Sequence, residues 1–99
     1  LKLPTRKKNV FDVFHLYTVY HPKRSKIIKH LSKKKIQTRI IYPYPIHLMK
    51  GYKSFFKRKK FKISEIKSRG IFSLPLYPEL KIHSVYKICK ELKKILNKL

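Results

Sequence analysis

The chain has 99 residues, of which 42% are hydrophobic and 13% aromatic, and its 27 Lys and Arg face only four Asp and Glu, a formal net charge of +23. This apolar content is too high for a disordered tail, and the length limits the chain to one domain, residues 1–99, with a modest core. The single cysteine, Cys89, excludes an intrachain disulfide and a cysteine-based metal site. No apolar run approaches the roughly 18 residues that a membrane span requires.

The excess of positive charge has two interpretations. Basic proteins of this kind bind nucleic acid, because neutralising phosphates releases counterions. However, 22 of the 27 basic residues are lysine and only five are arginine, Ala and Trp are absent, and Lys and Ile dominate. Proteins that read nucleic-acid bases rely on arginine for bidentate contacts. The codon bias of an AT-rich genome, which favours Lys and Ile, therefore explains the charge better. A small nucleic-acid-binding protein stays the alternative function.

In the first half of the chain, residues 9–22 ("NVFDVFHLYTVYHP") alternate β-branched and aromatic residues, which predicts a strand that is apolar on both faces. Pro22 then suits the first turn of a helix. The apolar stripe of that helix consists of Ile27, Ile28 and Leu31. A second strand is predicted over residues 36–42, with Ile36, Thr38 and Ile40 on one face.

In the second half, "ISEIKSRGI" predicts a short helix that ends at Gly70, and "FSLPLYPEL" predicts an extended segment broken by prolines. Residues 81–99 are predicted to form an amphipathic helix, and Cys89 is expected there as a small buried hydrophobe. The stripe of that helix is Ile82, Val85, Ile88, Leu92, Ile95 and Leu99. These elements predict a small two-layer α/β (α+β) domain with a short sheet packed by helices and a long C-terminal helix.

The loop between these halves, "RIIYPYPIHLMKGY", is the segment best suited to binding. Tyr42 and Tyr44 each precede a proline, so both are restricted to extended conformations and the loop is stiff. A stiff segment that carries Tyr42, Tyr44 and His47 suits the wall of a cleft for a polar ligand. The alternative is that both rings pack in a core corner and His47 makes one ordinary hydrogen bond. Arg39 and Lys50 flank the loop, where their charge could meet a diphosphate.

A self-sufficient catalytic centre is not predicted. The five histidines lack the spacing of metal ligands, and the two glycines are too far apart for a phosphate-binding loop. No serine stands in a glycine elbow, as the nucleophile of a hydrolytic triad would. We therefore assign no catalytic, metal-binding or cofactor-binding residue to this chain.

The order of several sequence blocks resembles the C-terminal part of the DegT/DnrJ/StrS family of sugar aminotransferases. The blocks are "HLY", then "IQTRIIYPYPIH", then "FKISE" and finally "SLPLYPEL". They correspond to an "HLY" strand, a strand that runs into a "Y-P-x-P-x-H" loop, an "fPvaE" helix start and an "SLP-x-yPeL" segment. Tyr42 and His47 match positions of the loop motif. The chain departs from the pattern at Ile41, where many relatives have a histidine, at Lys62 in place of a proline, and at Lys35 in place of a frequent glycine.

The resemblance implies the small C-terminal domain of a dimeric fold-type-I enzyme that depends on pyridoxal phosphate (PLP). Such enzymes move an amino group from a donor such as glutamate to a nucleotide-linked keto-sugar, for cell-surface glycans or secondary metabolites. The Schiff-base lysine belongs to an N-terminal domain that this chain lacks, so the chain alone is expected neither to bind PLP nor to catalyse. The loop with Tyr42, Tyr44, His47 and the flanking Arg39 is expected near the substrate. Without a signal peptide, a cytoplasmic location is expected, and the initial Leu1 suggests a start further upstream.

Overall fold

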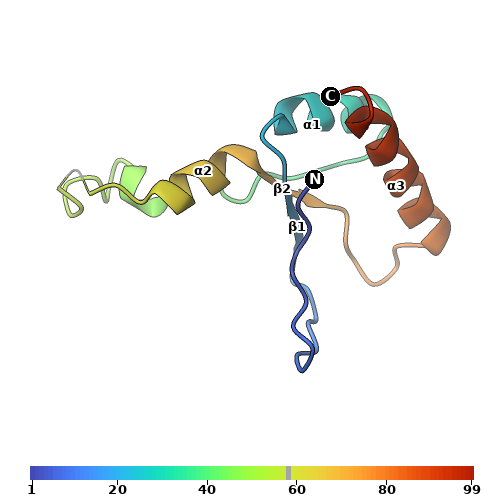
Figure 1. Cartoon of the computed structure of the whole chain (residues 1–99), viewed down its shortest axis with the longest axis horizontal. Helices are drawn as coiled ribbons and strands as arrows, with labels where there is room; N and C mark the ends of the chain where they lie inside the picture. Colours follow the sequence, from blue (N-terminus) through green and yellow to red (C-terminus); the bar gives the residue numbers. More distant parts are fainter. Residues whose placement is uncertain (58) are drawn as a thin grey trace.

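The computed structural model describes residues 1–57 and 59–99. Its elements follow in the order β1 (Tyr17–Tyr20), α1 (Arg24–Lys33), the 3₁₀ helix η1 (Ile46–Leu48), α2 (Lys62–Gly70), β2 (Ile71–Leu74) and α3 (Ile82–Leu96) (Figure 1). The short sheet with helices packed on it and the long final helix confirm the predicted mixed class. Helix α2 leads away from the sheet, on the opposite side from α1 and α3 (Figure 1).

The sheet is smaller than the sequence predicts. Strands β1 and β2 pair antiparallel over four residues each, from Tyr17 opposite Leu74 to Tyr20 opposite Ile71. The predicted strand over residues 9–22 is therefore wrong in its first half, where Phe11 is 92% exposed. A longer strand would need a partner for its backbone groups, and β2 ends before Pro75, which has no N–H to donate.

The second predicted strand, residues 36–42, is also wrong. This segment makes a single antiparallel bridge, between Arg39 and Ser73, at the free edge of β2. Ile36 is buried, whereas Ile40, which the prediction places on the same face, is 38% exposed. Because Pro43 follows directly, pairing cannot continue beyond the end of the segment.

The core lies between one face of the sheet and the helices α1 and α3, which pack against each other. Val19 of β1 and Phe72 of β2 point into it and are almost fully buried. The other core residues are Ile27, Leu31, Ile36, Ile88 and Leu92. On the opposite face, the hydroxyls of Thr18 and Ser73 are 3.1 Å apart and hydrogen-bonded across the strands. The sequence predicted the apolar stripe of α1 correctly, with Ile28 at its margin.

Helix α1 ends in a Schellman motif. The N–H of Ile36 donates to the carbonyl of Leu31, and the N–H of Lys35 donates to that of Ser32, both at 2.9 Å. The buried side chains of Leu31 and Ile36 complete the motif as its apolar pair. Lys35 has a φ of 58°, in the left-handed region that favours glycine. Lys35, which stands where the family pattern frequently has glycine, thus occupies a turn position that glycine would adopt with less strain.

Helix α2 begins and ends as the sequence predicts, and its end is fixed by α1. The guanidinium Nη1 of Arg24 donates to the carbonyl oxygens of Ser68 and Ile71. These groups include one of the last carbonyls of α2, which have no partner within the helix. Gly70 fits against the preceding strand so closely that a Cβ there would lie 2.4 Å from Cε2 of Tyr20.

Helix α3 confirms most of its predicted stripe. Ile88 and Leu92 are buried, and Ile95 packs against the core, whereas Ile82 at the first turn is 67% exposed. The prediction that Cys89 is a buried hydrophobe is wrong, because its side chain is exposed. Cys89 follows Ile88 directly and is turned by about 100° around the helix, which carries it off the buried stripe.

Candidate functional site

The loop between Tyr42 and Leu48 presents its two tyrosines to solvent. Tyr42 is 70% exposed and Tyr44 is 66% exposed, so neither ring packs in a core corner. Pro45 has an extended backbone, with φ −68° and ψ 148°, and directly precedes η1. The bonds from Leu48 N–H to Pro45 and from Met49 N–H to Ile46 close this single 3₁₀ turn. Two Tyr-Pro pairs therefore give an extended, stiff segment that is fixed at one end by a helical turn.

A hollow of about 470 Å³ separates this loop from α2 and the start of β2. Its lining residues include Ile41, Tyr42, Tyr44, Pro45, His47, Met49, Phe61 and Lys67. Apolar side chains prevail in this lining, and its polar members are Tyr42, Tyr44, His47, Ser64, Lys67 and Ser68. A groove with this composition suits a ligand that has one apolar face and a few polar groups.

His47 is buried, in contrast to the tyrosines, with only 5% of its side chain exposed. Its ring lies against Phe61, with centroids 4.7 Å apart, and meets Phe56 edge-on at 6.2 Å. Its Nε2 donates to Oε1 of Glu65 at 3.0 Å. His47 therefore anchors the loop to α2, which agrees with the predicted ordinary hydrogen bond.

Glu65 is a site residue that the sequence reasoning did not single out. Its carboxylate accepts the bond from His47 and another from the backbone N–H of Phe61, at the start of α2. The His47 bond is the main cause that lowers the pKa of Glu65 below its ordinary value, and the Phe61 N–H adds to it. The available signal was the "FKISE" block itself, in which Glu65 matches the acidic end of the family motif.

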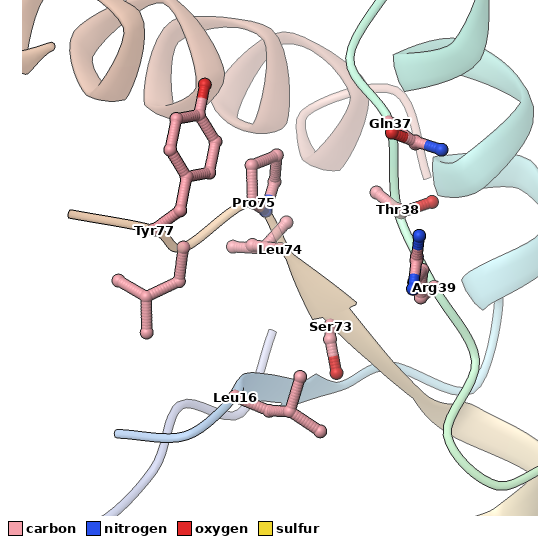
Figure 2. Close-up of a pocket in the computed structure, with 9 residues that line it drawn as sticks. Leu16, Gln37, Thr38, Arg39, Ser73, Leu74, Pro75 and Tyr77 are labelled. Atoms are coloured by element: carbon pink, nitrogen blue, oxygen red, sulfur yellow. The ribbon is translucent and has the colours of Figure 1, made fainter. Parts of the chain in front are cut away.

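Arg39 does not share the hollow of the tyrosines. It lines a second hollow of about 310 Å³, whose lining also includes Ser73 and Tyr77 (Figure 2). Its backbone is held by reciprocal bonds with Ser73, at 3.2 and 2.7 Å. The structure thus brings Tyr42, Tyr44 and His47 together and places Arg39 in a separate hollow. Their proximity to a substrate stays a prediction.

The side chains of this chain do not fit a complete PLP site. The cofactor needs an enclosed lysine for its covalent link and backbone N–H groups for its phosphate. All 22 lysines lie on the exposed surface. Of the two glycines, Gly70 lies in α2 and Gly51 in a turn, so they form no phosphate-binding loop.

Metal ligands do not converge in the described part of the chain, residues 1–57 and 59–99. Within these ranges, no three His, Cys, Asp or Glu side chains come close enough to hold a metal ion. None of the helices described there has both the length and the hydrophobicity needed to cross a bilayer.

The fold of the chain is also found in solved structures, among them a DegT DnrJ EryC1 StrS aminotransferase from Brucella abortus, with a TM-score of 0.84 and 23% identity over 95% of this chain and 26% of that one. The chain superimposes on Streptomyces venezuelae DesV, solved in complex with a ketimine intermediate, with a TM-score of 0.84 and 26% identity. The match covers 94% of this chain and 25% of DesV. The profile of the DegT/DnrJ/EryC1/StrS aminotransferase family matches residues 1–93, and the chain belongs to this family.

Sequence relatives point to the same family. A dTDP-3-amino-3,4,6-trideoxy-alpha-D-glucose transaminase from Micromonospora megalomicea is 38% identical over 82 residues, which are 81% of this chain and 22% of that enzyme. A dTDP-3-amino-3,6-dideoxy-alpha-D-galactopyranose transaminase from Aneurinibacillus thermoaerophilus is 33% identical over 88 residues, 89% of this chain and 24% of that enzyme. The chain thus spans less than a quarter of the length of either curated relative.

Proposed function

We propose that residues 1–99 are the C-terminal small domain of a PLP-dependent aminotransferase that acts on a nucleotide-linked keto-sugar. The observation that carries this proposal is the family match over residues 1–93, with relatives that are dTDP-amino-sugar transaminases. The domain works with an N-terminal PLP-binding domain, in an enzyme that forms a homodimer and takes its amino group from a donor such as glutamate. The product is an amino sugar for a surface polysaccharide or a related glycoside.

Within that enzyme, this chain contributes to binding and orientation. PLP, held by the other domain, supplies the electron sink for amino transfer. Tyr42 and Tyr44 stand exposed on a stiff loop and offer ring faces and hydroxyls to a sugar, at little cost in conformational entropy. Lys67 lines the same hollow, with its ammonium 4.8 Å from the centroid of the Tyr20 ring, and Arg39 lines the second hollow. Both supply positive charge for a diphosphate.

A chimeric enzyme tests this function. The matched C-terminal segment of the Micromonospora transaminase is replaced by residues 1–99 of this chain, and transamination of its dTDP-sugar substrate is measured. We expect measurable turnover, whereas the same enzyme without any C-terminal segment is inactive. The PLP absorbance of the chimera shows whether the remaining domain is folded. A chimera that binds PLP normally and produces no amino sugar contradicts the proposal.

The chain by itself is expected to be inactive, with no PLP bound through a lysine. Titration of the purified chain with PLP, followed by absorbance, checks this. The exposure of all 22 lysines keeps nucleic-acid binding as the alternative function. A nucleic-acid binder would bind duplex DNA or RNA at low salt and lose affinity as a steep power of salt concentration. Tight, salt-dependent binding together with an inactive chimera would favour that alternative.

A further inference from the structure

A single oxygen of Glu65 connects the loop between Tyr42 and Leu48 to α2. This oxygen, Oε1, accepts the Nε2–H of His47 at 3.0 Å and the backbone N–H of Phe61 at 3.1 Å. His47 belongs to η1, and Phe61 precedes the first residue of α2. The carboxylate therefore holds the end of the loop and the start of the helix in a fixed relation.

Two phenylalanine rings, Phe56 and Phe61, pack against the His47 side of this contact. His47 lies 4.7 Å from Phe61, and Phe61 lies 5.7 Å from Phe56 in an edge-to-face arrangement. We call these three rings and Glu65 the loop anchor. Only 5% of the His47 side chain is exposed, against 23% of the Glu65 side chain. Loss of the bond would therefore leave the imidazole N–H buried without a partner, which is costly.

The loop anchor is separate from the main core. None of its members belongs to the core cluster between the sheet, α1 and α3. Helix α2 leads away from that core (Figure 1), so the geometry of the loop depends on contacts within this projecting part of the chain. Pro43 and Pro45 restrict the backbone upstream of His47, so a shift of the anchor moves the whole tyrosine segment instead of being absorbed by it.

We propose that Glu65 is the positioning residue of this loop: by fixing His47, its carboxylate sets the direction in which Tyr42 and Tyr44 project. For its effect on substrate binding, the proposal rests on the function proposed above. The structural part can be tested in the 99-residue chain alone. The matched variants are Glu65→Ala, which removes the acceptor, and Glu65→Gln, which keeps an oxygen acceptor of the same reach. Glu79→Ala, at an exposed position, is the control.

The structural test uses NMR of the chain with ¹⁵N-labelled histidine, ring-labelled tyrosine and methyl-labelled leucine. We expect a slowly exchanging Nε2–H signal from His47 in the parent, Glu65→Gln and Glu79→Ala, and its loss in Glu65→Ala. The ring signals of Tyr42 and Tyr44 should shift with that loss, while methyl signals of Leu31 and Leu92 in the core stay unchanged. An unchanged His47 signal and unchanged tyrosine signals in Glu65→Ala overturn the proposal.

A second variant covers the case in which Glu65→Ala unfolds α2. His47→Phe keeps an aromatic ring in the cluster and removes only the bond to Glu65. Displaced Tyr42 and Tyr44 signals in this variant, with the helical signals of α2 retained, are the expected result. Tyrosine signals identical to those of the parent chain again contradict the positioning role.

The functional test uses the chimeric enzyme described above. For Glu65→Ala we expect KM for the nucleotide sugar to rise about tenfold with less change in kcat, and Glu65→Gln to recover most of that loss. PLP absorbance should be the same in all variants. If Glu65→Ala leaves KM unchanged in an active chimera, the role in substrate positioning is wrong. If every chimera is inactive while the NMR changes occur, the proposed function fails and the positioning role of Glu65 stands.

Discussion

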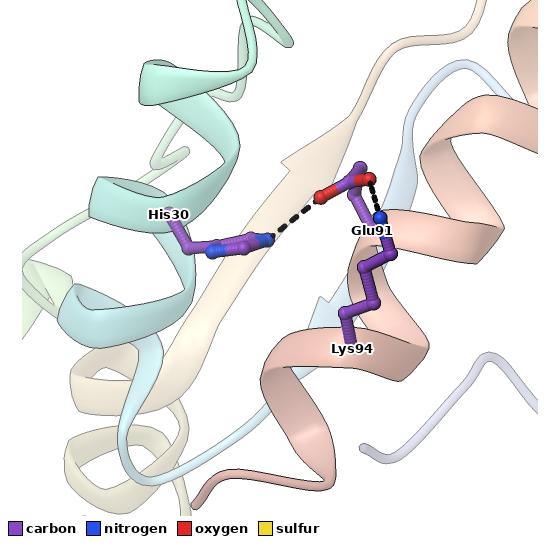
Figure 3. A network of polar contacts seen from close by, with 3 residues as sticks. All are labelled: His30, Glu91 and Lys94. Atoms are coloured by element: carbon purple, nitrogen blue, oxygen red, sulfur yellow. Dashed lines mark hydrogen bonds and ion pairs between the residues drawn. The ribbon is translucent and has the colours of Figure 1, made fainter.

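The imidazole of His30 on α1 lies 3.0 Å from Oε2 of Glu91 on α3, and this contact joins the two helices that cover the sheet (Figure 3). The other oxygen of Glu91 accepts a bond from the Lys94 ammonium at 2.8 Å. Glu91 is buried, so each of its oxygens has a cationic or ring N–H partner in place of water. A carboxylate in this position makes the packing of α1 on α3 depend on its charge.

Acid should therefore loosen the packing of α1 on α3. The Lys94 bond lowers the pKa of Glu91 below its ordinary value, with a further contribution from His30 and against the opposing effect of burial. Since the folded state favours the charged form, this stabilisation is present above the unfolded pKa of about 4.3 and is lost as pH falls through the lower folded value. Glu91→Gln should be less stable than the parent at pH 7, and the difference should shrink below about pH 4.

Urea unfolding at a series of pH values between 7 and 3 measures this difference. Glu79→Gln, at an exposed position, is the matched control and should follow the parent at every pH. Glu65 also has a lowered pKa and is unchanged in both variants, so its contribution cancels from the comparison. A difference between the parent and Glu91→Gln that stays constant across the range would exclude this role for the Glu91 charge.

Gly70 is required by close packing rather than by a left-handed backbone. A Cβ at this position would lie 2.4 Å from Cε2 of Tyr20 and 2.9 Å from the backbone oxygen of His21. The ring can move but the backbone oxygen is fixed in the turn after β1, so Gly70→Ala should lower the free energy of unfolding by about 1–3 kcal/mol. Gly51→Ala is the control, because nothing lies within 4 Å of the place that its added methyl group would take.

Chemical denaturation of both variants gives the comparison. Gly51→Ala should stay within about 0.5 kcal/mol of the parent. Equal losses in free energy of unfolding in the two variants would mean that the close contacts of Gly70 with Tyr20 and His21 do not exclude a methyl group at position 70.

Lys35 offers the opposite case, a position where glycine should improve the fold. Its φ of 58° in the Schellman motif after α1 costs a residue with a Cβ about 1–2 kcal/mol. Glycine at this position would avoid that cost, but part of the benefit is offset because glycine has more conformational freedom in the unfolded chain. Lys35→Gly should therefore raise the free energy of unfolding by about 0.5–1 kcal/mol. Lys34→Gly, one residue earlier and at negative φ (−94°), should not stabilise the chain.

The sequence predicted the helices well because their signals are local. The stripe of Ile27 and Leu31 and the stop at Gly70 depend on residues within one or two turns. The strands were predicted too long because pairing depends on a distant partner, and β2 offers only four residues before Pro75. Exposed Phe11 and buried Phe72 carry the same β-forming signal, and only the presence of a paired strand separates them.

For the candidate site too, the local features could be predicted from the sequence and the distant contacts could not. Local chemistry predicted the stiff loop, since Tyr42 and Tyr44 each precede a proline. The contact between His47 and Glu65 joins residues 18 positions apart, so neither spacing nor composition indicated it. Arg39 was grouped with the loop by its nearness in sequence, but its bridge to Ser73 directs it to another hollow.

The tyrosines of the loop should matter for the substrate and not for the fold. Tyr42 and Tyr44 are both about two-thirds exposed or more, so Tyr42→Ala and Tyr44→Ala should each change the free energy of unfolding of the chain by less than about 0.5 kcal/mol. In the chimeric enzyme, each should raise KM for the nucleotide sugar about tenfold, which corresponds to about 1.4 kcal/mol of binding free energy. Tyr86→Ala, on the exposed side of α3 at 71% exposure, is the control for loss of a surface ring. If all three variants show the same KM in an enzyme that turns over, the loop does not contact the sugar nucleotide and Arg39 in its separate hollow becomes the residue to test.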